Sequence, residues 1–181
     1  MISVFSFHPE HFNNNGDQGN IEVLAKELGA RGSDVTYTQD LVGADFALVG
    51  DASRAAMKHF SEELEAIRPQ LVERLGIGRP TLIVGSSYEY FADSLGLSVK
   101  CGSRKSEFIL ESGYFGYRNT DSDLPAIFRK DLFVATSLFG PLLAKNPELL
   151  SEYLVRFGLD GKLDEKRLVW IAEIRRRSID A

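Results

Sequence analysis

The sequence predicts an α/β fold, with a mostly parallel central sheet flanked by helices and a small antiparallel extension. Segments of strand type alternate with amphipathic helical segments along most of the 181 residues. The run Thr81–Val84 carries no charge and no polar alternation, which is typical of a parallel strand covered on both faces. Between Ser98 and Phe128, strand-like pieces follow one another without a helical pattern, which predicts the antiparallel part.

The first elements follow from apolar runs and the turn formers between them. Ile2–Phe7 is branched and aromatic, Asp34–Thr38 alternates, and Phe46–Val49 is apolar, so each run predicts a strand. The turn formers of Asn13–Asp17 lead into a helix that ends near Gly29. The apolar face of this helix consists of Ile21, Leu24 and Leu28.

A long amphipathic helix is predicted over Met57–Leu75, where apolar residues recur at spacings of three and four. Pro69 lies inside this pattern. Because proline lacks a backbone donor and crowds the preceding turn, we expect a kink or a break there. The buried strand Thr81–Val84 follows, and then a helical segment over Tyr88–Leu95.

The C-terminal half supplies the extension, one more buried strand and two helices. Glu107–Glu111 and Gly113–Tyr117 predict strands of the extension, and Leu132–Leu138 predicts the buried strand. Proline near a helix start predicts a helix from Pro147, and the last helix runs over about Asp164–Arg177. The residues expected to point inward from that last helix are Leu168, Ile171 and Ile174.

Length and composition bound the classes of function. At roughly 150 residues per domain, the length predicts a single domain over 1–181. The formal charge is −5 and the sequence pI is about 5.3, which argues against a general nucleic-acid binder or an anionic-membrane binder. The longest apolar stretch, Leu132–Ala144, is interrupted and too short to span a bilayer. We therefore expect a cytoplasmic protein without membrane insertion.

Three loops are expected to gather on one side of the sheet. Ligands of parallel α/β sheets bind beyond the carboxyl ends of the strands. This rule points to His8–Asn20, to Gly85–Glu89 and to the segment after Leu138.

The turn after Thr81–Val84 has the order strand, sharp turn, helix that presents the nucleophile in many hydrolases. The elbow position itself falls on Gly85, which has no side chain, so Ser86 and Ser87 remain as conceivable nucleophiles. Serine needs a base within hydrogen-bond reach to react. The plain alternative is that both serines cap the following helix.

Histidines and the lone cysteine offer weaker candidates. His8 and His11 lie near the expected site loops, and a metal site built with Asp17 is the alternative to an ordinary polar loop, which we favour. His59 is expected at the surface of the long helix. Cys101 is the only cysteine, which excludes an internal disulfide and leaves no thiolate cluster for zinc. We expect no metal and no cofactor.

Several blocks of the chain, in order from residue 13 to about 150, resemble one family. The segment Asn15–Asn20 resembles Y-G-D-R-G-N, Pro80–Glu89 aligns without a gap on P-x-L-A-I-C-G-G-Y-Q, and Phe139–Pro147 resembles H-G-P-L-L-x-K-N-P. These are motifs of the cobyric-acid-synthase-like class I glutamine amidotransferases. Within them, the chain most resembles the small glutaminase subunit of lipid II isoglutaminyl synthase. The resemblance implies a flavodoxin-like class I glutamine amidotransferase domain.

The resemblance fails at the residues that carry the family's chemistry. The family's nucleophilic cysteine aligns with Gly85, and its basic histidine aligns with Phe139. Where the family has E-N-H, this chain has Phe115-Gly116-Tyr117. Glycine and phenylalanine neither accept a proton nor form an acyl intermediate, so we expect no glutaminase activity by the family mechanism.

These departures imply a catalytically inactive glutamine-amidotransferase-like protein that acts as a binding or regulatory subunit. The partner class implied by the resemblance is a ligase or synthetase, such as a Mur-ligase-like protein, and a homodimer is equally compatible. One alternative is a hydrolase or amidotransferase whose nucleophile has moved to Ser86 or Ser87. Another is a small-metabolite sensor that uses an apolar pocket at Tyr88, Phe115 and Phe139. The pocket candidates are Asn15, Gly16, Asp17, Gly19, Asn20, Ser86, Ser87, Tyr88, Glu89, Phe115 and Phe139.

Overall fold

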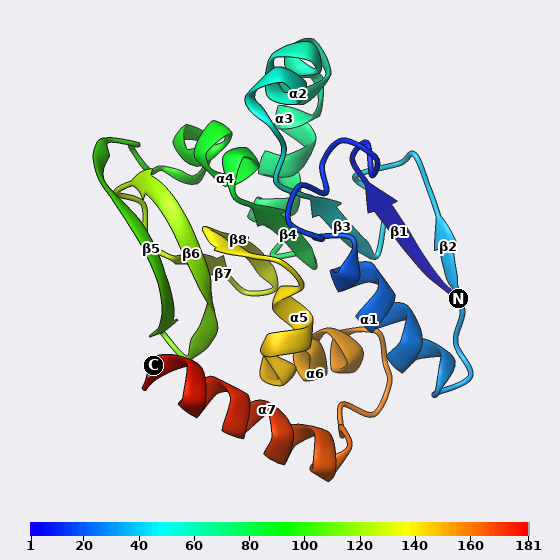
Figure 1. Ribbon diagram of the computed structural model, residues 1–181. Coiled ribbons are helices and arrows are strands. Elements are labelled where there is room, and N and C mark those ends of the chain that lie inside the picture. The colour runs from blue at the N-terminus through cyan, green and yellow to red at the C-terminus, as the bar shows by residue number, and fades with distance from the viewer. Residues whose placement is uncertain (181) are drawn as a thin grey trace.

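A six-stranded sheet forms the centre of the molecule, which a computed structural model describes over residues 1–180 (Figure 1). Its order is β2-β1-β3-β4-β8-β7; the first five strands in this order run parallel, and β7 is antiparallel to β8. The predicted mostly parallel sheet is confirmed, with Thr81–Val84 as an interior strand. The strands are β1 (Ile2–Ser6), β2 (Val35–Tyr37), β3 (Phe46–Val49), β4 (Thr81–Val84), β7 (Ile127–Lys130) and β8 (Phe133–Thr136).

Helices cover both faces of this sheet, with α1, α5, α6 and α7 on one side and α2, α3 and α4 on the other (Figure 1). Each side has its own core cluster, and β4 contributes to both because alternate side chains of a strand point to opposite faces. The helices are α1 (Gly19–Gly29), α2 (Arg54–His59), α3 (Ser61–Gly76), α4 (Ser86–Tyr90), the 3₁₀ turn η1 (Ala92–Leu95), α5 (Leu142–Lys145), α6 (Pro147–Arg156) and α7 (Glu165–Ile179).

The predicted antiparallel extension is a separate three-stranded sheet in the order β5-β6-β9. Its strands are β5 (Cys101–Glu111), β6 (Tyr114–Ser122) and β9 (Leu138–Phe139). Ser112 and Gly113 join β5 to β6 with φ of 53° and 84°, as a two-residue hairpin turn with right-handed strand twist requires. The third strand, β9, follows β8 after one residue and pairs Phe139 with Tyr117, so the chain passes there from the large sheet into the small one.

The break expected at Pro69 is wrong, because the long helical pattern divides at Phe60 instead. Phe60 has φ −95° and ψ 17° and is buried between α2 and α3, so the chain turns there to place its ring in the core. Pro69 lies on the exposed side of α3, which continues through it. Water can reach the carbonyl that proline leaves without a donor, and this lowers the cost of keeping the helix.

The last helix packs less deeply than its apolar pattern predicts. Of its residues only Ile171 is buried, whereas Leu168 and Ile174 are each 38% exposed. The expectation that all three point fully inward is therefore wrong for two of them. No helix within residues 1–180 is long and apolar enough to cross a bilayer.

Candidate functional site

The turn between β4 and α4 forms an elbow at Gly85. This residue has φ 60° and ψ −123°, a backbone conformation that side chains disfavour. Its N–H donates to the Thr136 carbonyl of the neighbouring strand at 2.8 Å. Glycine adopts these angles freely, so Gly85 accommodates the sharp turn between β4 and α4.

Neighbouring side chains fill the space in which a nucleophile would lie. A Cβ atom added at Gly85 would lie 2.4 Å from Asp51 Oδ1 and 2.8 Å from Phe139 Cε1. Both distances are below the closest approach of real Cβ atoms. Phe139 therefore lies beside the elbow and occupies space that a side chain at position 85 would need.

Asp51 binds the backbone amide that follows the elbow. The Ser86 N–H donates to Asp51 Oδ1 at 2.8 Å, while Asn15 and Asn14 donate side-chain amides to Asp51 Oδ2 at 2.7 and 3.1 Å. In elbow hydrolases the amide after the nucleophile helps to stabilise the oxyanion. In this chain a carboxylate of the protein already accepts that hydrogen bond.

Asp17 binds the backbone of Asp51. Asp17 is fully buried, and its Oδ2 accepts the Asp51 N–H at 2.8 Å. The pKa of Asp17 is raised to about 7, chiefly because the carboxyl group is buried; the hydrogen bond from the Asp51 amide lowers it, and the nearby Asp51 charge raises it. Asp17 Oδ1 is buried without a hydrogen-bond partner among the described residues. An aspartate that is close to half protonated at neutral pH thus supports the elbow.

Lys145 approaches the same cluster from α5. Its Nζ donates to the Phe139 carbonyl, and burial lowers its pKa to about 8, an effect that the Asp17 charge opposes. We call Asn14, Asn15, Asp17, Asp51, Phe139 and Lys145 the elbow cluster. It brings together three segments that are far apart in sequence.

The remaining residues of the Asn15–Asn20 segment hold the fold rather than line an opening. A Cβ at Gly19 would lie 2.6 Å from Pro141, so only glycine lets the two loops approach this closely. Asn20 is fully buried; its Nδ2 donates to the Asp17 carbonyl and its Oδ1 accepts the Leu143 N–H. Gly16 has φ 75° in the exposed turn before them.

Both serines after the elbow bind the loop that follows β3. Ser86 Oγ accepts the Ala52 N–H and donates to the Ala52 carbonyl, at 2.9 and 3.0 Å. Ser87 Oγ is buried and donates to the Gly50 carbonyl at 2.7 Å. The expectation that they cap α4 is wrong, because the N-cap of that helix is Gly85 and no side chain caps it. Glu89, the next polar candidate, accepts a hydrogen bond from Thr120 of β6.

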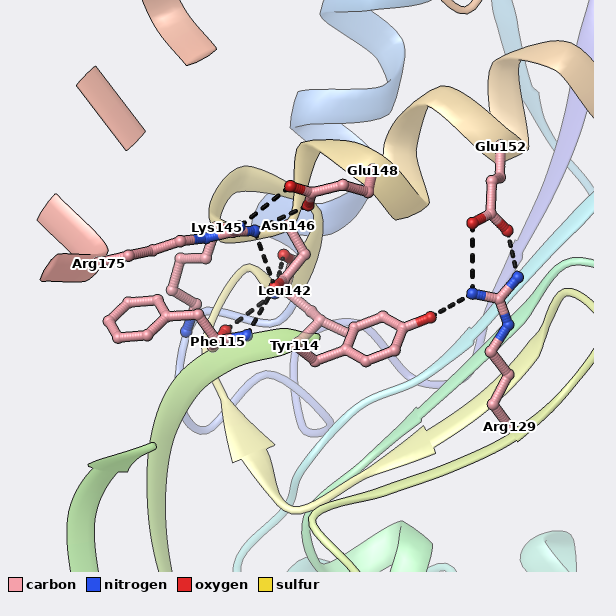
Figure 2. A network of polar contacts seen from close by, with 9 residues as sticks. All are labelled: Tyr114, Phe115, Arg129, Leu142, Lys145, Asn146, Glu148, Glu152 and Arg175. Atoms are coloured by element: carbon pink, nitrogen blue, oxygen red, sulfur yellow. Dashed lines mark hydrogen bonds and ion pairs between the residues drawn. The ribbon is translucent and has the colours of Figure 1, made fainter. Parts of the chain in front are cut away.

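The three aromatic candidates do not share one pocket. Tyr88 is buried in the core on the α3 side, whereas Phe139 packs against the core on the α1 side. Phe115 stacks on Phe108 with ring centroids 5.8 Å apart. Its main-chain N–H and carbonyl are both bound by the side chain of Asn146 (Figure 2). An apolar ligand pocket formed by these three side chains is thus not what the structure shows.

The histidines gather elsewhere, around Phe60. The ring centroids of His8, His11 and His59 lie 4.1, 5.0 and 4.7 Å from that of Phe60. His8 also contacts Glu63 at 2.7 Å. Among residues 1–180 no group of three or more His, Cys, Asp or Glu side chains is placed to hold a metal ion, and His8, His11 and Asp17 are not brought together.

The sequence interpretation missed Asp51, Asn14 and Lys145 as site residues. Asp51 lies two residues after the end of β3, at the carboxyl end of the strand beside β4, and that position is a signal available from the sequence. For Lys145 the sequence holds no such signal, because its place depends on the fold of the short helix α5. Cys101 is exposed on β5, away from these residues.

Among solved structures, a putative GMP synthase subunit from Thermoplasma acidophilum is similar over 97% of this chain and 98% of its own, with 15% identity and a TM-score of 0.52. A glutamine amidotransferase from Thermotoga maritima is similar over 99% of both chains, with 14% identity and a TM-score of 0.49. No family model matches the chain, and no curated protein matches it. The first likeness shows that the chain has the flavodoxin-like fold of class I glutamine amidotransferase domains.

Proposed function

We propose that this chain is a catalytically inactive glutamine-amidotransferase-like protein that acts as a binding or regulatory subunit, with a ligase or synthetase of the Mur-ligase-like class as its partner. One observation carries the inactivity: at the elbow, Asp51 and Phe139 occupy the place of the nucleophile. The motif resemblance from residue 13 to about 150 supports the partner class. The fold shared with a putative GMP synthase subunit is consistent with a subunit role.

Three physical conditions for glutamine hydrolysis fail together. Gly85 supplies no thiol, and Phe139 supplies no base. The Ser86 amide already binds Asp51 Oδ1, so a developing oxyanion would compete with a fixed negative charge. Loss of a nucleophile and its base together leaves no acylation route.

A relocated serine nucleophile has no geometric support. The hydroxyls of Ser86 and Ser87 are bound to the backbone of Ala52 and Gly50. The histidine rings lie around Phe60 instead of beside these serines. We therefore do not favour the hydrolase alternative.

Ammonia release from glutamine by the purified chain tests the inactivity. We expect no release above background. Release by the unaltered chain, abolished by Ser86→Ala/Ser87→Ala, would overturn the proposal and support a relocated nucleophile.

A stepwise restoration tests the cause of the inactivity. Gly85→Cys/Phe139→His alone should stay inactive, because the new Cβ would still overlap Asp51. Adding Asp51→Ala frees both the space and the Ser86 amide, so the triple variant should release ammonia. The matched control carries Gly85→Ala together with Phe139→His and Asp51→Ala, and it should release no ammonia.

The partner class is tested separately. The purified chain is mixed with the Mur-ligase-like protein of the same organism, and both sedimentation and the ligase rate are measured. We expect a complex or a changed rate. Independent sedimentation with an unchanged rate would exclude this partner and leave the inactivity proposal standing.

A further inference from the structure

The outward face of α7 carries apolar side chains that the rest of residues 1–180 leaves uncovered. Val169 and Trp170 are 71% and 68% exposed, against 7% for Ile171 on the opposite face. A shallow hollow is lined by Val169, Trp170, Glu165, Lys166 and Glu173. An exposed tryptophan next to an exposed valine is the type of contact that forms the centre of a protein interface.

The other face fixes the orientation of this helix. Arg175 donates to the Lys145 carbonyl from both Nε and Nη2, at 2.9 and 2.7 Å, and forms an ion pair with Glu148 (Figure 2). Arg167 forms an ion pair with Glu27 of α1 at 2.5 Å. Because these contacts and Ile171 hold the inward face, Val169 and Trp170 are presented to the outside. Burying them by simple rotation would break both ion pairs.

Two opposite charges on the outward face, those of Lys166 and Glu173, lie at equal distances along the sequence from the two apolar residues. Lys166 lies three positions before Val169, and Glu173 lies three positions after Trp170. Side chains three or four positions apart lie on the same face of a helix. An antiparallel copy of the helix, related by a two-fold axis between Val169 and Trp170, would place each Lys166 opposite the other copy's Glu173. A parallel copy would place like charges together.

We propose that the outward face of α7 binds a second copy of this chain, through an antiparallel pairing of the two α7 helices. Val169 and Trp170 of both copies then pack across the two-fold axis, and two Lys166–Glu173 pairs flank them. Such a surface is self-complementary, as a two-fold interface requires. Lys166 forms no ion pair within residues 1–180, so its charge is available for the second copy. Glu173 already pairs with Arg176 and Arg177 of its own helix, at 2.9 and 2.6 Å. Both pairs are exposed and therefore weak, so Lys166 of the second copy can exchange with them.

Sedimentation and fluorescence over about 1 to 100 µM protein test the pairing. The mass should rise from the 20.1 kDa monomer to twice that value. Because Trp170 is the only tryptophan, its emission should shift to shorter wavelength over the same range. Val169→Asp should keep the monomer mass and the long-wavelength emission. Val72→Asp, the same change at a 46% exposed site on α3, should leave the dimer intact.

A charge exchange distinguishes this pairing from other contacts. Lys166→Glu alone puts two glutamates opposite each other, and Glu173→Lys alone puts two lysines opposite each other, so each variant should remain a monomer. Mixed together, they should form a mixed dimer, because both flanking pairs are again of opposite charge. A monomer mass for the unaltered chain at every concentration, or a dimer that Val169→Asp leaves unchanged, would overturn the proposal. Both results are independent of the inactivity at the elbow.

Discussion

Asp51 accepts three hydrogen bonds at the elbow, from the amide of Ser86 and the side chains of Asn14 and Asn15. A carboxylate with this many donors is well stabilised even when it is nearly buried. In an active elbow site the same region must stay open for a substrate oxygen. In this chain the Asp51 carboxylate occupies that region. Because Asp51 belongs to the chain itself, only a substitution of Asp51 would open the region to a substrate.

Gly85→Ala should destabilise the fold more than an ordinary glycine substitution at positive φ. The added Cβ meets Asp51 Oδ1 at 2.4 Å, while Gly96, with φ 74°, has nothing within 4 Å of its added Cβ. Both changes introduce backbone strain, but only the first also overpacks. We expect Gly85→Ala to lose about 1–3 kcal/mol more than Gly96→Ala in urea unfolding. Equal losses would show that the space beside Gly85 is not filled.

Asp17 should make stability depend on pH. Its folded pKa of about 7 lies above the ordinary value of 3.8, so the folded state holds a proton that the unfolded state releases. The contribution of this group is therefore fully favourable below about pH 4 and is lost as pH rises through 7. Asp17→Asn removes the titration and keeps an acceptor for the Asp51 N–H.

The measurement is the free energy of unfolding of both proteins between pH 4 and pH 8. Relative to the unaltered chain, Asp17→Asn should gain stability as pH rises through that range, by a few kcal/mol in all, as a shift of about three pKa units implies. The Asp17 charge also raises the pKa of Lys145, so the difference between the two proteins reports the coupled Asp17–Lys145 pair. A difference independent of pH would contradict a protonated, buried Asp17.

At the residue scale, the sequence alone pointed to the two motif positions that lack a nucleophile and a base. It did not point to the side chain that occupies the space beside Gly85. Gly85 and Phe139 were singled out because each aligns with one position of a motif, and the two residues lie side by side at the elbow. Asp51 was not named as a site residue, although its place after β3 can be read from the sequence, because its role depends on hydrogen bonds to partners 34 to 37 positions away. Such contacts exist only after β3 has paired with β1 and with β4.

Among the elements, α7 depends on polar contacts to an unusual degree. Arg175 joins α7 to Lys145, Asn146 and Glu148. Of the side chains of α7, only that of Ile171 is buried. Arg175→Ala should therefore loosen the helix, at a cost of about 1–3 kcal/mol for several hydrogen bonds to charged groups. Faster proteolytic cleavage in the connection between α6 and α7 would report this. Arg176→Ala, at a 63% exposed side chain, should leave the cleavage rate unchanged.

The sequence predicted best those elements in which every residue of the element follows one hydrophobic pattern. The strands at Phe46–Val49 and Thr81–Val84 have the bounds that their apolar runs predict. The division of the long helix at Phe60 was missed because no breaker residue marks it; burial of one aromatic ring decides it. The strand β9 and the helix α5, of two and four residues, are too short to carry a periodic signal.

The whole molecule has two cores that share one sheet, and the single-domain prediction can be tested through them. Leu82 and Ile83 are adjacent on β4, fully buried, and belong to different clusters. Because both clusters depend on the same strands, Leu82→Ala and Ile83→Ala should each lower one common unfolding transition, by about 2–5 kcal/mol. Ile77→Ala, at a 59% exposed site, should have little effect.

Circular dichroism and tyrosine fluorescence should follow this transition together in both variants. Separate midpoints, with each substitution shifting only one of them, would show that the two layers unfold independently and would contradict a single domain.

The hairpin of β5 and β6 also affects the order in which the chain can fold. Strands β4 and β8 pair residues 81 and 133, so their pairing closes a long loop, and the entropy cost of closure grows with the length of free chain. The hairpin lies inside that loop and is local, with Ser112-Gly113 as its turn, and local hairpins form within microseconds. Once Cys101 pairs with Ser122, most of the intervening chain is already ordered, and only two short segments remain to be closed. The small sheet therefore shortens the effective contact order of the large one.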